Sequence, residues 1–126
     1  MTIDKIIKRD GTLVPFDKWK ITFAIFQATV AVGKRDKGLA ELVAGDVLQH
    51  LEDLVTGGTP GSKMVYPSVE EVQDLVEKCL IERGHAKIAK AYIVYRYEHA
   101  LKRKELKNLT YSSENIPYKK LWQALN

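Results

Sequence analysis

The chain shows two kinds of hydrophobic spacing, one typical of a short hairpin and one typical of helices. Apolar residues flank the dipeptide Asp10-Gly11 on both sides. Because Asp-Gly adopts the positive backbone angles of a two-residue turn, residues 6–17 are predicted to form a β-hairpin. Further along, apolar residues recur every three or four positions, which is the spacing of one helix face. This pattern predicts helices at residues 18–32, 39–55, 69–83 and 86–106.

Each predicted helix carries a stripe of residues that we expect to face a common core. The stripes are Ile21, Ile25, Ala28 and Val32 in the first helix, Leu39, Val43, Val47, Leu51 and Leu54 in the second, Val69, Val72, Val76 and Cys79 in the third, and Ile88, Tyr92, Tyr95 and His99 in the fourth.

Local signals mark the ends of these helices. Asp17 is a candidate N-cap of the first helix, because its carboxylate can accept from the first unpaired backbone amides. Ser68 and Glu71 form a capping box before the third helix, in which each side chain is expected to reach the other residue's amide. Gly33 and Gly84 are suited to end the first and third helices.

The order of these elements predicts an α+β fold, a four-helix bundle capped by a small β-hairpin. Residues 64–66 are a candidate third strand, so the cap is expected as a hairpin or a three-stranded sheet. A lone hairpin is only marginally stable in water, so it must pack on the helices. Residues 108–117 are typical of a linker and residues 118–126 of a short amphipathic helix. We therefore expect one domain at residues 1–107, followed by this linker and helix.

Composition places the chain among ordinary globular proteins. It has 126 residues, of which 45% are hydrophobic and 29% charged, enough for one modest core. The net charge of +4 is a mild bias that suits an anionic partner without identifying it. The single cysteine, Cys79, excludes an internal disulfide and fits a reducing cytoplasm. No apolar run has the length of a signal peptide core or a membrane span, so a cytoplasmic protein is expected.

A cluster of cations is the main candidate for chemistry. Lys8, Arg9, Lys18 and Lys20 lie within a few residues of the junction between the hairpin and the first helix. Such a cluster can hold a polyphosphate. Exposed lysines at such positions are equally often solvated surface, although Lys18 and Lys20 lie where the helix dipole disfavours cations. The residues alone leave both interpretations open.

Arg96 and Tyr97 of the fourth helix fall beside its apolar stripe and are candidates for the border of a pocket. Arg96 can grip phosphate through its planar guanidinium group. Packing or solvent exposure is the competing interpretation for both.

Other motifs fail as catalytic or metal sites. Residues 57–64 resemble a phosphate-binding P-loop, but Ser62 stands where the motif needs glycine before Lys63, and Met64 follows instead of Ser or Thr. The three histidines lack metal-ligand spacing, and one cysteine makes no thiolate cluster. We therefore expect neither a catalytic group nor a bound metal ion.

Three separated blocks of sequence, in this order, resemble the ATP-cone domain. The first contains IIKRDG at residues 6–11, FDK at 16–18 and KI at 20–21, the second is PSVEEVQDLVE at 67–77 and the third is AKIAKAYIVYR at 86–96. The resemblance covers residues 3–101. It implies a four-helix bundle capped by a small sheet, which agrees with the fold expected above.

The resemblance also implies a nucleotide site and a role for each of its residues. Lys8 and Arg9 would hold phosphates, Ile6 would face adenine, Asp17 would accept from the exocyclic amine, Lys20 would lie between base, ribose and phosphates, and Gln73 would face the ribose. Glu98 stands where some members carry a phosphate-binding lysine, and Arg96 and Tyr97 would substitute for it.

The function implied by the resemblance is allosteric. ATP cones bind ATP or dATP, here expected with Mg²⁺, and control the overall activity of ribonucleotide reductases. The expected partners are an adenine nucleotide, a reductase catalytic domain or subunit toward which residues 108–126 would lead, and a second cone. The domain itself would have no catalytic site, and neither membrane nor nucleic acid is an expected partner. Two alternatives are a free-standing or repressor-type cone, and a small basic helical module that binds nucleic acid.

Overall fold

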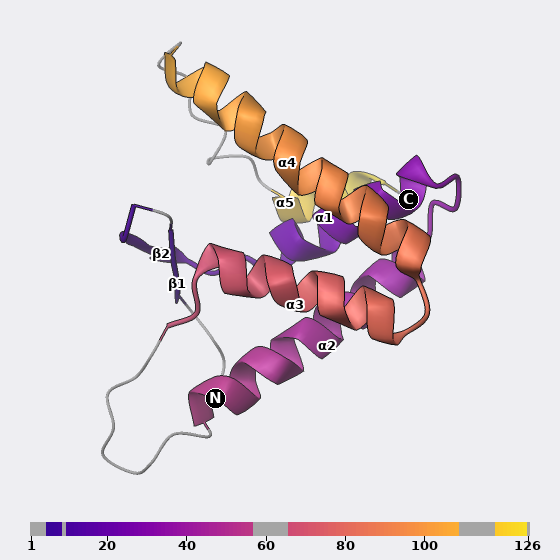
Figure 1. The fold of residues 1–126 in the computed structure, drawn as a ribbon, viewed down its shortest axis with the longest axis horizontal. Coiled ribbons are helices and arrows are strands. Elements are labelled where there is room, and N and C mark those ends of the chain that lie inside the picture. Colours follow the sequence, from indigo (N-terminus) through magenta and orange to yellow (C-terminus); the bar gives the residue numbers. More distant parts are fainter. Residues whose placement is uncertain (1–4, 9, 57–65, 109–117, 126) are drawn as a thin grey trace.

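The computed structural model describes residues 5–8, 10–56, 66–108 and 118–125. Its elements follow the predicted order (Figure 1): a hairpin, four long helices and one short helix. They are β1 (Lys5–Ile7), β2 (Leu13–Pro15), α1 (Lys18–Ala31), α2 (Lys37–Thr56), α3 (Val69–Glu82), α4 (Ala86–Asn108) and α5 (Tyr118–Ala124). The predicted α+β fold, a helical bundle capped by a hairpin, is confirmed.

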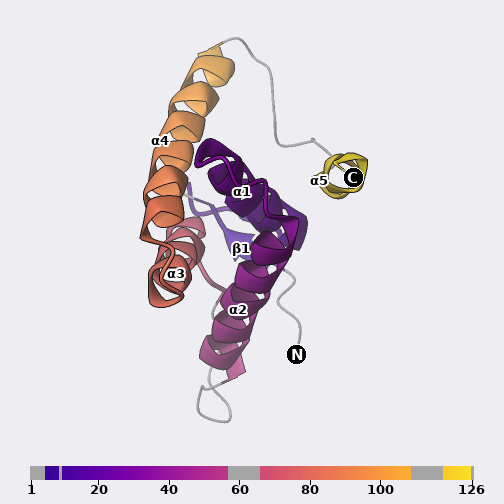
Figure 2. The same cartoon turned by 90° about the vertical axis from the view of Figure 1, so that its right-hand side faces the viewer.

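Helix α1 is central to the bundle, because it contacts α2, α4 and α5. Figure 2 shows α4 on one flank of α1 and α5 on another. The termini of α1 and α3 are close to the predicted ones. Asp17 caps α1 by accepting from the Trp19 amide at 3.0 Å. Ser68 caps α3 by accepting from the Glu71 amide at 3.1 Å. The Glu71 carboxylate accepts from the Ser68 hydroxyl at 3.2 Å, whereas a full capping box would use the Ser68 amide.

The hairpin pairs Lys5 with Pro15 and Ile7 with Leu13, in antiparallel register. The prediction of a two-residue Asp-Gly turn is wrong. The Gly11 amide donates to the Lys8 carbonyl at 2.9 Å, and Gly11 alone of the dipeptide has positive φ, at +87°. A longer turn followed by a left-handed glycine is another common hairpin connection.

The side chain of Asp10 explains this longer turn. Its carboxylate accepts from the Thr12 amide at 3.0 Å and from the Thr12 hydroxyl at 2.6 Å. Aspartate often closes turns by such local hydrogen bonds, and it does not then need a left-handed backbone.

The hairpin is joined to the segment that precedes α3. The Ile7 amide donates to the Pro67 carbonyl at 2.9 Å, and Ile7 forms an isolated parallel bridge with Ser68. Of the candidate third strand, Met64 and Val65 lie outside the described residues, and Tyr66 belongs to no strand. Among the described residues the sheet therefore has two strands.

The core lies between the four long helices, and half or more of each predicted stripe is buried there. Its buried members include Ile25, Phe26, Ala28, Val43, Val47, Leu51, Val72, Val76, Cys79, Leu80, Ile88 and Tyr92. Leu54 is an exception at 65% exposure. Figure 2 shows the reason, because the C-terminal end of α2 projects beyond α3 and α4.

The buried face of α1 also differs from the predicted stripe. Ile21 and Val32 are half-buried, whereas Thr22 and Thr29 are fully buried. Each threonine hydroxyl donates to its own helix, that of Thr22 to the Lys18 carbonyl at 3.1 Å and that of Thr29 to the Phe26 carbonyl at 2.6 Å. Because these hydroxyls are paired, the core can accept them.

None of the helices in the described ranges is both long enough and apolar enough to cross a membrane.

Candidate functional site

A cavity of about 150 Å³ lies where the hairpin meets α1, α3, α4 and the first residue of α5. Six of the eight residues singled out in the sequence line this cavity: Ile6, Lys8, Asp17, Lys20, Gln73 and Arg96. They come from three separate segments of the chain. Their convergence depends on the hairpin docking beside the start of α3, which the hydrogen bond from Ile7 to Pro67 secures.

The other two residues lie elsewhere. Arg9 lies outside the described residues. Tyr97 is 66% exposed and does not line the cavity. The α4 residues that do are Tyr92, Tyr95, Arg96 and His99, and their spacing of three and four defines one helix face. Tyr97 lies one position beyond Arg96 and therefore points away from that face. Lys18, a member of the cation cluster, is also exposed and outside the cavity wall.

The wall combines apolar and cationic side chains. Ile6, Val14, Phe16 and Val72 are among the apolar residues that can enclose a flat, weakly polar group. Lys8, Lys20 and Arg96 bring positive charge to the same cavity, and Asp17 brings a carboxylate. This composition suits a ligand with an apolar body and an anionic tail.

Arg96 is already part of an ion-pair network. Its Nη1 donates to Glu77 and, at 3.3 Å, to Asp74. Burial by itself lowers the pKa of Arg96, but the hydrogen bonds to Glu77 and Asp74 outweigh it and raise that pKa above its usual value. The guanidinium group is thus charged at any physiological pH. A guanidinium group has five N–H donors, and those on Nε and Nη2 take no part in these two ion pairs.

Gln73 contributes an unpaired acceptor. Its Oε1 is buried and has no hydrogen-bond partner among the described residues. Most buried polar atoms in folded proteins are paired, so such an atom calls for an explanation. A ligand that donates a hydrogen bond inside the cavity would supply one.

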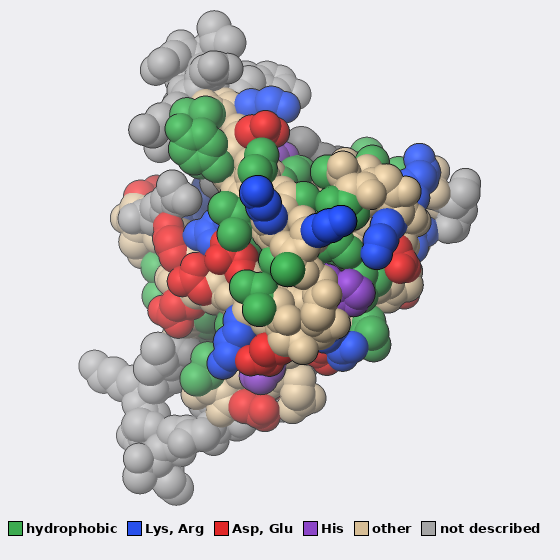
Figure 3. Space-filling model, turned by 45° about the vertical axis from the view of Figure 1, so that its right-hand side comes forward, with side chains coloured by type: hydrophobic (Ala, Val, Ile, Leu, Met, Phe, Trp, Pro, Cys, Tyr) green, Lys and Arg blue, Asp and Glu red, His purple; other side chains and the backbone are tan. Residues whose placement is uncertain are grey.

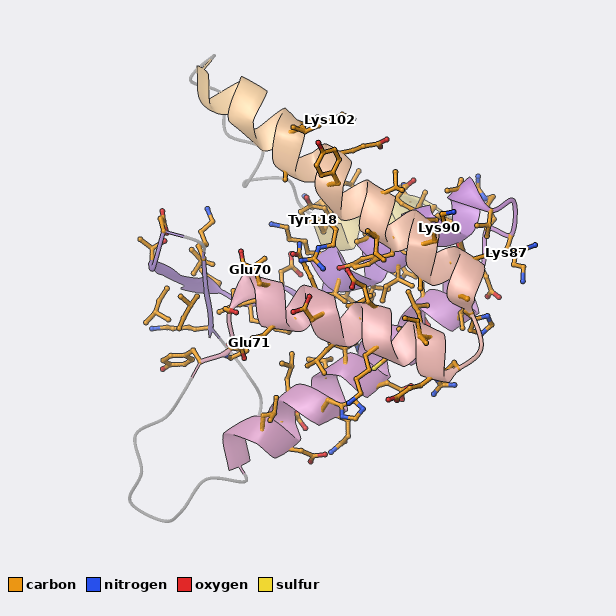
Figure 4. The ribbon with its side chains drawn as sticks, viewed as in Figure 1. Glu70, Glu71, Lys87, Lys90, Lys102 and Tyr118 are labelled. Atoms are coloured by element: carbon orange, nitrogen blue, oxygen red, sulfur yellow. The ribbon has the colours of Figure 1, made fainter. Side chains whose placement is uncertain are left out.

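Sequence reasoning missed several lining residues. Tyr95 and His99 were expected in the core, but they are half-buried in the wall, with ring centroids 4.3 Å apart. The spacing of Tyr92, Tyr95, Arg96 and His99 was a readable signal for a shared face. Tyr118 had no such signal, because residues 109–117 separate it from α4. Figure 4 shows Tyr118 in the region between α4 and the start of α3.

Other candidate chemistry is weak in this fold. Cys79 is only 3% exposed, and burial raises the pKa of its thiol, which opposes a role as nucleophile. The described residues contain no cluster of three or more His, Cys, Asp or Glu side chains that could hold a metal ion. Residues 57–64, whose sequence partly resembles a P-loop, lie outside the described residues.

Several known proteins that resemble this chain carry the name of a ribonucleoside-diphosphate or ribonucleoside-triphosphate reductase. The chain is 38% identical over 108 residues to a vitamin B12-dependent ribonucleoside-diphosphate reductase of Thermoplasma acidophilum. The aligned region covers 82% of this chain and 13% of the relative. The chain is 36% identical over 96 residues to the enzyme of the same name from Mycobacterium tuberculosis, covering 76% of this chain and 12% of the relative. It is 30% identical over 100 residues to the anaerobic ribonucleoside-triphosphate reductase of Escherichia coli, covering 79% of this chain and 13% of the relative.

The chain thus spans about an eighth of the length of these reductases. The family model of the ATP cone domain matches residues 4–101, which include the hairpin and all four long helices apart from the last turns of α4. This chain belongs to the ATP cone domain family.

Proposed function

We propose that this domain binds ATP or dATP in the cavity and thereby controls the overall activity of a ribonucleotide reductase. The observation that carries the proposal is that one cavity collects Ile6, Lys8, Asp17, Lys20 and Gln73, residues that the family resemblance assigns to nucleotide binding. The names of the relatives support the link to a reductase.

The adenosine part of the ligand has three contacts in this proposal. Ile6 and its apolar neighbours in the wall face the adenine ring. Asp17 caps α1 through Oδ1, which leaves Oδ2 to accept from the exocyclic amine of adenine. Gln73 Oε1, which is buried without a partner among the described residues, accepts from a ribose hydroxyl.

The triphosphate is bound by positive charge. Lys8 and Lys20 line the cavity and hold phosphate oxygens, and Arg9 of the hairpin turn joins them. Arg96 engages Glu77 and Asp74 through Nη1, so its Nε and Nη2 groups donate to phosphate. Tyr97, which is exposed and points away from the cavity face of α4, makes no contact with the nucleotide in this proposal.

Mg²⁺ accompanies the nucleotide as a counterion of the phosphates. Phosphate oxygens and water would be its ligands, as is usual for Mg²⁺ bound together with a nucleotide. The domain performs no chemistry of its own, and its cytoplasmic setting keeps Cys79 reduced.

Control of a reductase requires that ATP and dATP favour different states of the domain. A ligand shifts a conformational equilibrium only by its difference in affinity for the two states. We propose that the two nucleotides set different arrangements of hairpin and helices. These arrangements change how the domain associates with the reductase catalytic domain or subunits, and with a second cone.

Isothermal titration of the protein with ATP and with dATP tests the proposal, with GTP as the control for the base. We expect saturable binding of both adenine nucleotides and much weaker binding of GTP. Folded protein that gives no heat with either adenine nucleotide would refute the proposal. Binding to DNA that falls steeply with salt, without preference for adenine, would favour a nucleic-acid module instead. On the face shown in Figure 3, acidic and hydrophobic side chains lie beside several of the cationic ones.

A further inference from the structure

Helix α5 lies outside the segment that matches the family, yet it contributes to the cavity. The match ends at residue 101, and α5 spans Tyr118–Ala124. Tyr118 is 9% exposed and lines the cavity together with Lys20 and Gln73. The wall therefore contains a residue that the family model does not cover.

The anchor of α5 is Trp122, one helical turn after Tyr118. Its ring packs edge-on against Phe26, with centroids 5.4 Å apart, and its Nε1 donates to Glu41 at 3.2 Å. Lys37 Nζ lies 4.6 Å from the centroid of this ring. At 3% exposure, Trp122 fixes α5 to α1 and α2 without itself lining the cavity.

Tyr118 is connected to the cationic part of the cavity through Lys20. The Lys20 Nζ lies 5.8 Å from the centroid of the Tyr118 ring, and the Tyr118 ring packs edge-on against Phe23, with centroids 5.9 Å apart. A lysine that binds phosphate beside this ring holds the ligand against Tyr118. Conversely, withdrawal of the ring opens one side of the cavity.

We propose that Tyr118 is a further nucleotide-binding residue, so that occupancy of the cavity and docking of α5 on α1 are thermodynamically coupled. This inference rests on the proposed nucleotide site. If the docked helix binds nucleotide more tightly, nucleotide stabilises the docked helix by the same factor. Nucleotide binding then changes how firmly α5 is docked, and α5 lies outside residues 4–101.

Isothermal titration of the full chain with ATP tests the role of Tyr118. We expect Tyr118→Ala to weaken ATP binding about tenfold, because the aromatic wall and its cation–π contact with Lys20 are lost together. Tyr118→Phe keeps the ring and should bind ATP within about twofold of wild type. The matched control is Leu121→Ala, on the same helix but 39% exposed and outside the cavity wall, which should leave the affinity unchanged.

Tryptophan fluorescence reports on the docking of α5. The chain has two tryptophans, and both lie at the contact of α1 and α5, with the ring centroids of Trp19 and Trp122 6.3 Å apart. We expect saturating ATP to change the emission of wild type and of Leu121→Ala, and to have much less effect on Tyr118→Ala. Should Tyr118→Ala fail to fold, Tyr118→Leu, which keeps apolar volume but removes the ring, serves in the same comparison.

The outcomes separate the two proposals. Wild type that binds ATP, together with a folded Tyr118→Ala or Tyr118→Leu variant of unchanged affinity, overturns the inference about α5 and leaves the nucleotide site intact. Wild type that binds no ATP overturns both. Selective loss of affinity in the variants without the ring supports the inference.

Discussion

The unpaired amide oxygen of Gln73 allows a test in which stability and binding move in opposite directions. Gln73 Oε1 is buried and has no hydrogen-bond partner among the described residues. Replacement of glutamine by methionine keeps the length of the side chain and a similar helix propensity, but it removes the acceptor. We therefore expect Gln73→Met to stabilise the ligand-free domain and to weaken ATP binding.

The size of both effects follows from the cost of an unmade hydrogen bond. A buried polar group without a partner costs about 1–3 kcal/mol. Gln73 is half-buried and faces a cavity, so the lower end of about 1 kcal/mol applies. For a chain of this size, that gain in the free energy of unfolding raises the Tm by about 3–5 °C. Loss of one ligand hydrogen bond of the same strength weakens ATP binding about fivefold.

Urea titration followed by circular dichroism measures the free energy of unfolding, and isothermal titration measures ATP affinity. Gln49→Met is the matched control, because Gln49 is an exposed helical glutamine that donates to Asp53 at 3.1 Å. Its effect on stability should stay within about 0.5 kcal/mol, and its effect on ATP binding should be nil.

Either of two results would refute the reasoning about Gln73. The first is a fall of about 1 kcal/mol or more in the free energy of unfolding of Gln73→Met, which would mean that the amide is well paired in the ligand-free protein. The second is an ATP affinity equal to that of wild type, which would mean that the ligand does not use this acceptor.

Three more predictions concern the charge, the caps and the core. Lys20→Ala should weaken ATP binding about tenfold in isothermal titration, whereas Lys90→Ala, an exposed lysine of α4 outside the cavity wall, should not, and equal effects would contradict the site. Ser68→Ala should lower the free energy of unfolding in urea by about 1 kcal/mol through loss of the N-cap of α3, and Ser68→Gly by only a few tenths, so equal losses would argue against the cap. Burial, and after it the nearby carboxylates, raises the pKa of the Cys79 thiol above its usual 9.0, so its stabilising contribution is complete below pH 9.0 and is lost as pH rises through the folded-state pKa. The stability difference between wild type and Cys79→Ala, from urea titrations, should therefore shrink above pH 9.0, and a constant difference would be contrary to this expectation.

The helices and most of their ends could be predicted because their causes are local. Asp17 and Ser68 accept from amides two and three residues away. Gly33 and Gly84 take positive φ, at +82° and +81°, just after α1 and α3. Such interactions depend on neighbours in sequence, so the sequence displays them.

The misses have causes that a local pattern does not contain. Leu54 fits the stripe of α2 but is exposed, because α2 extends beyond its neighbours. Thr22 and Thr29 are polar but buried, because their hydroxyls donate to carbonyls of their own helix. Tyr97 adjoins Arg96 in sequence but lies outside the cavity wall, because one residue rotates a helical side chain by about 100°.

Local patterns in the sequence are enough to predict the α+β class and the order of the elements, and the family resemblance adds the candidate nucleotide residues of the hairpin and α1. The tertiary structure decided which of these residues meet. Gln73 and Arg96 reach the cavity only because α3 and α4 pack beside the hairpin, and Tyr118 reaches it only because Trp122 anchors α5 on α1. Helix periodicity and capping arise from contacts within four residues, whereas the cavity arises from contacts between distant segments, whose pairing is set by packing of the whole core.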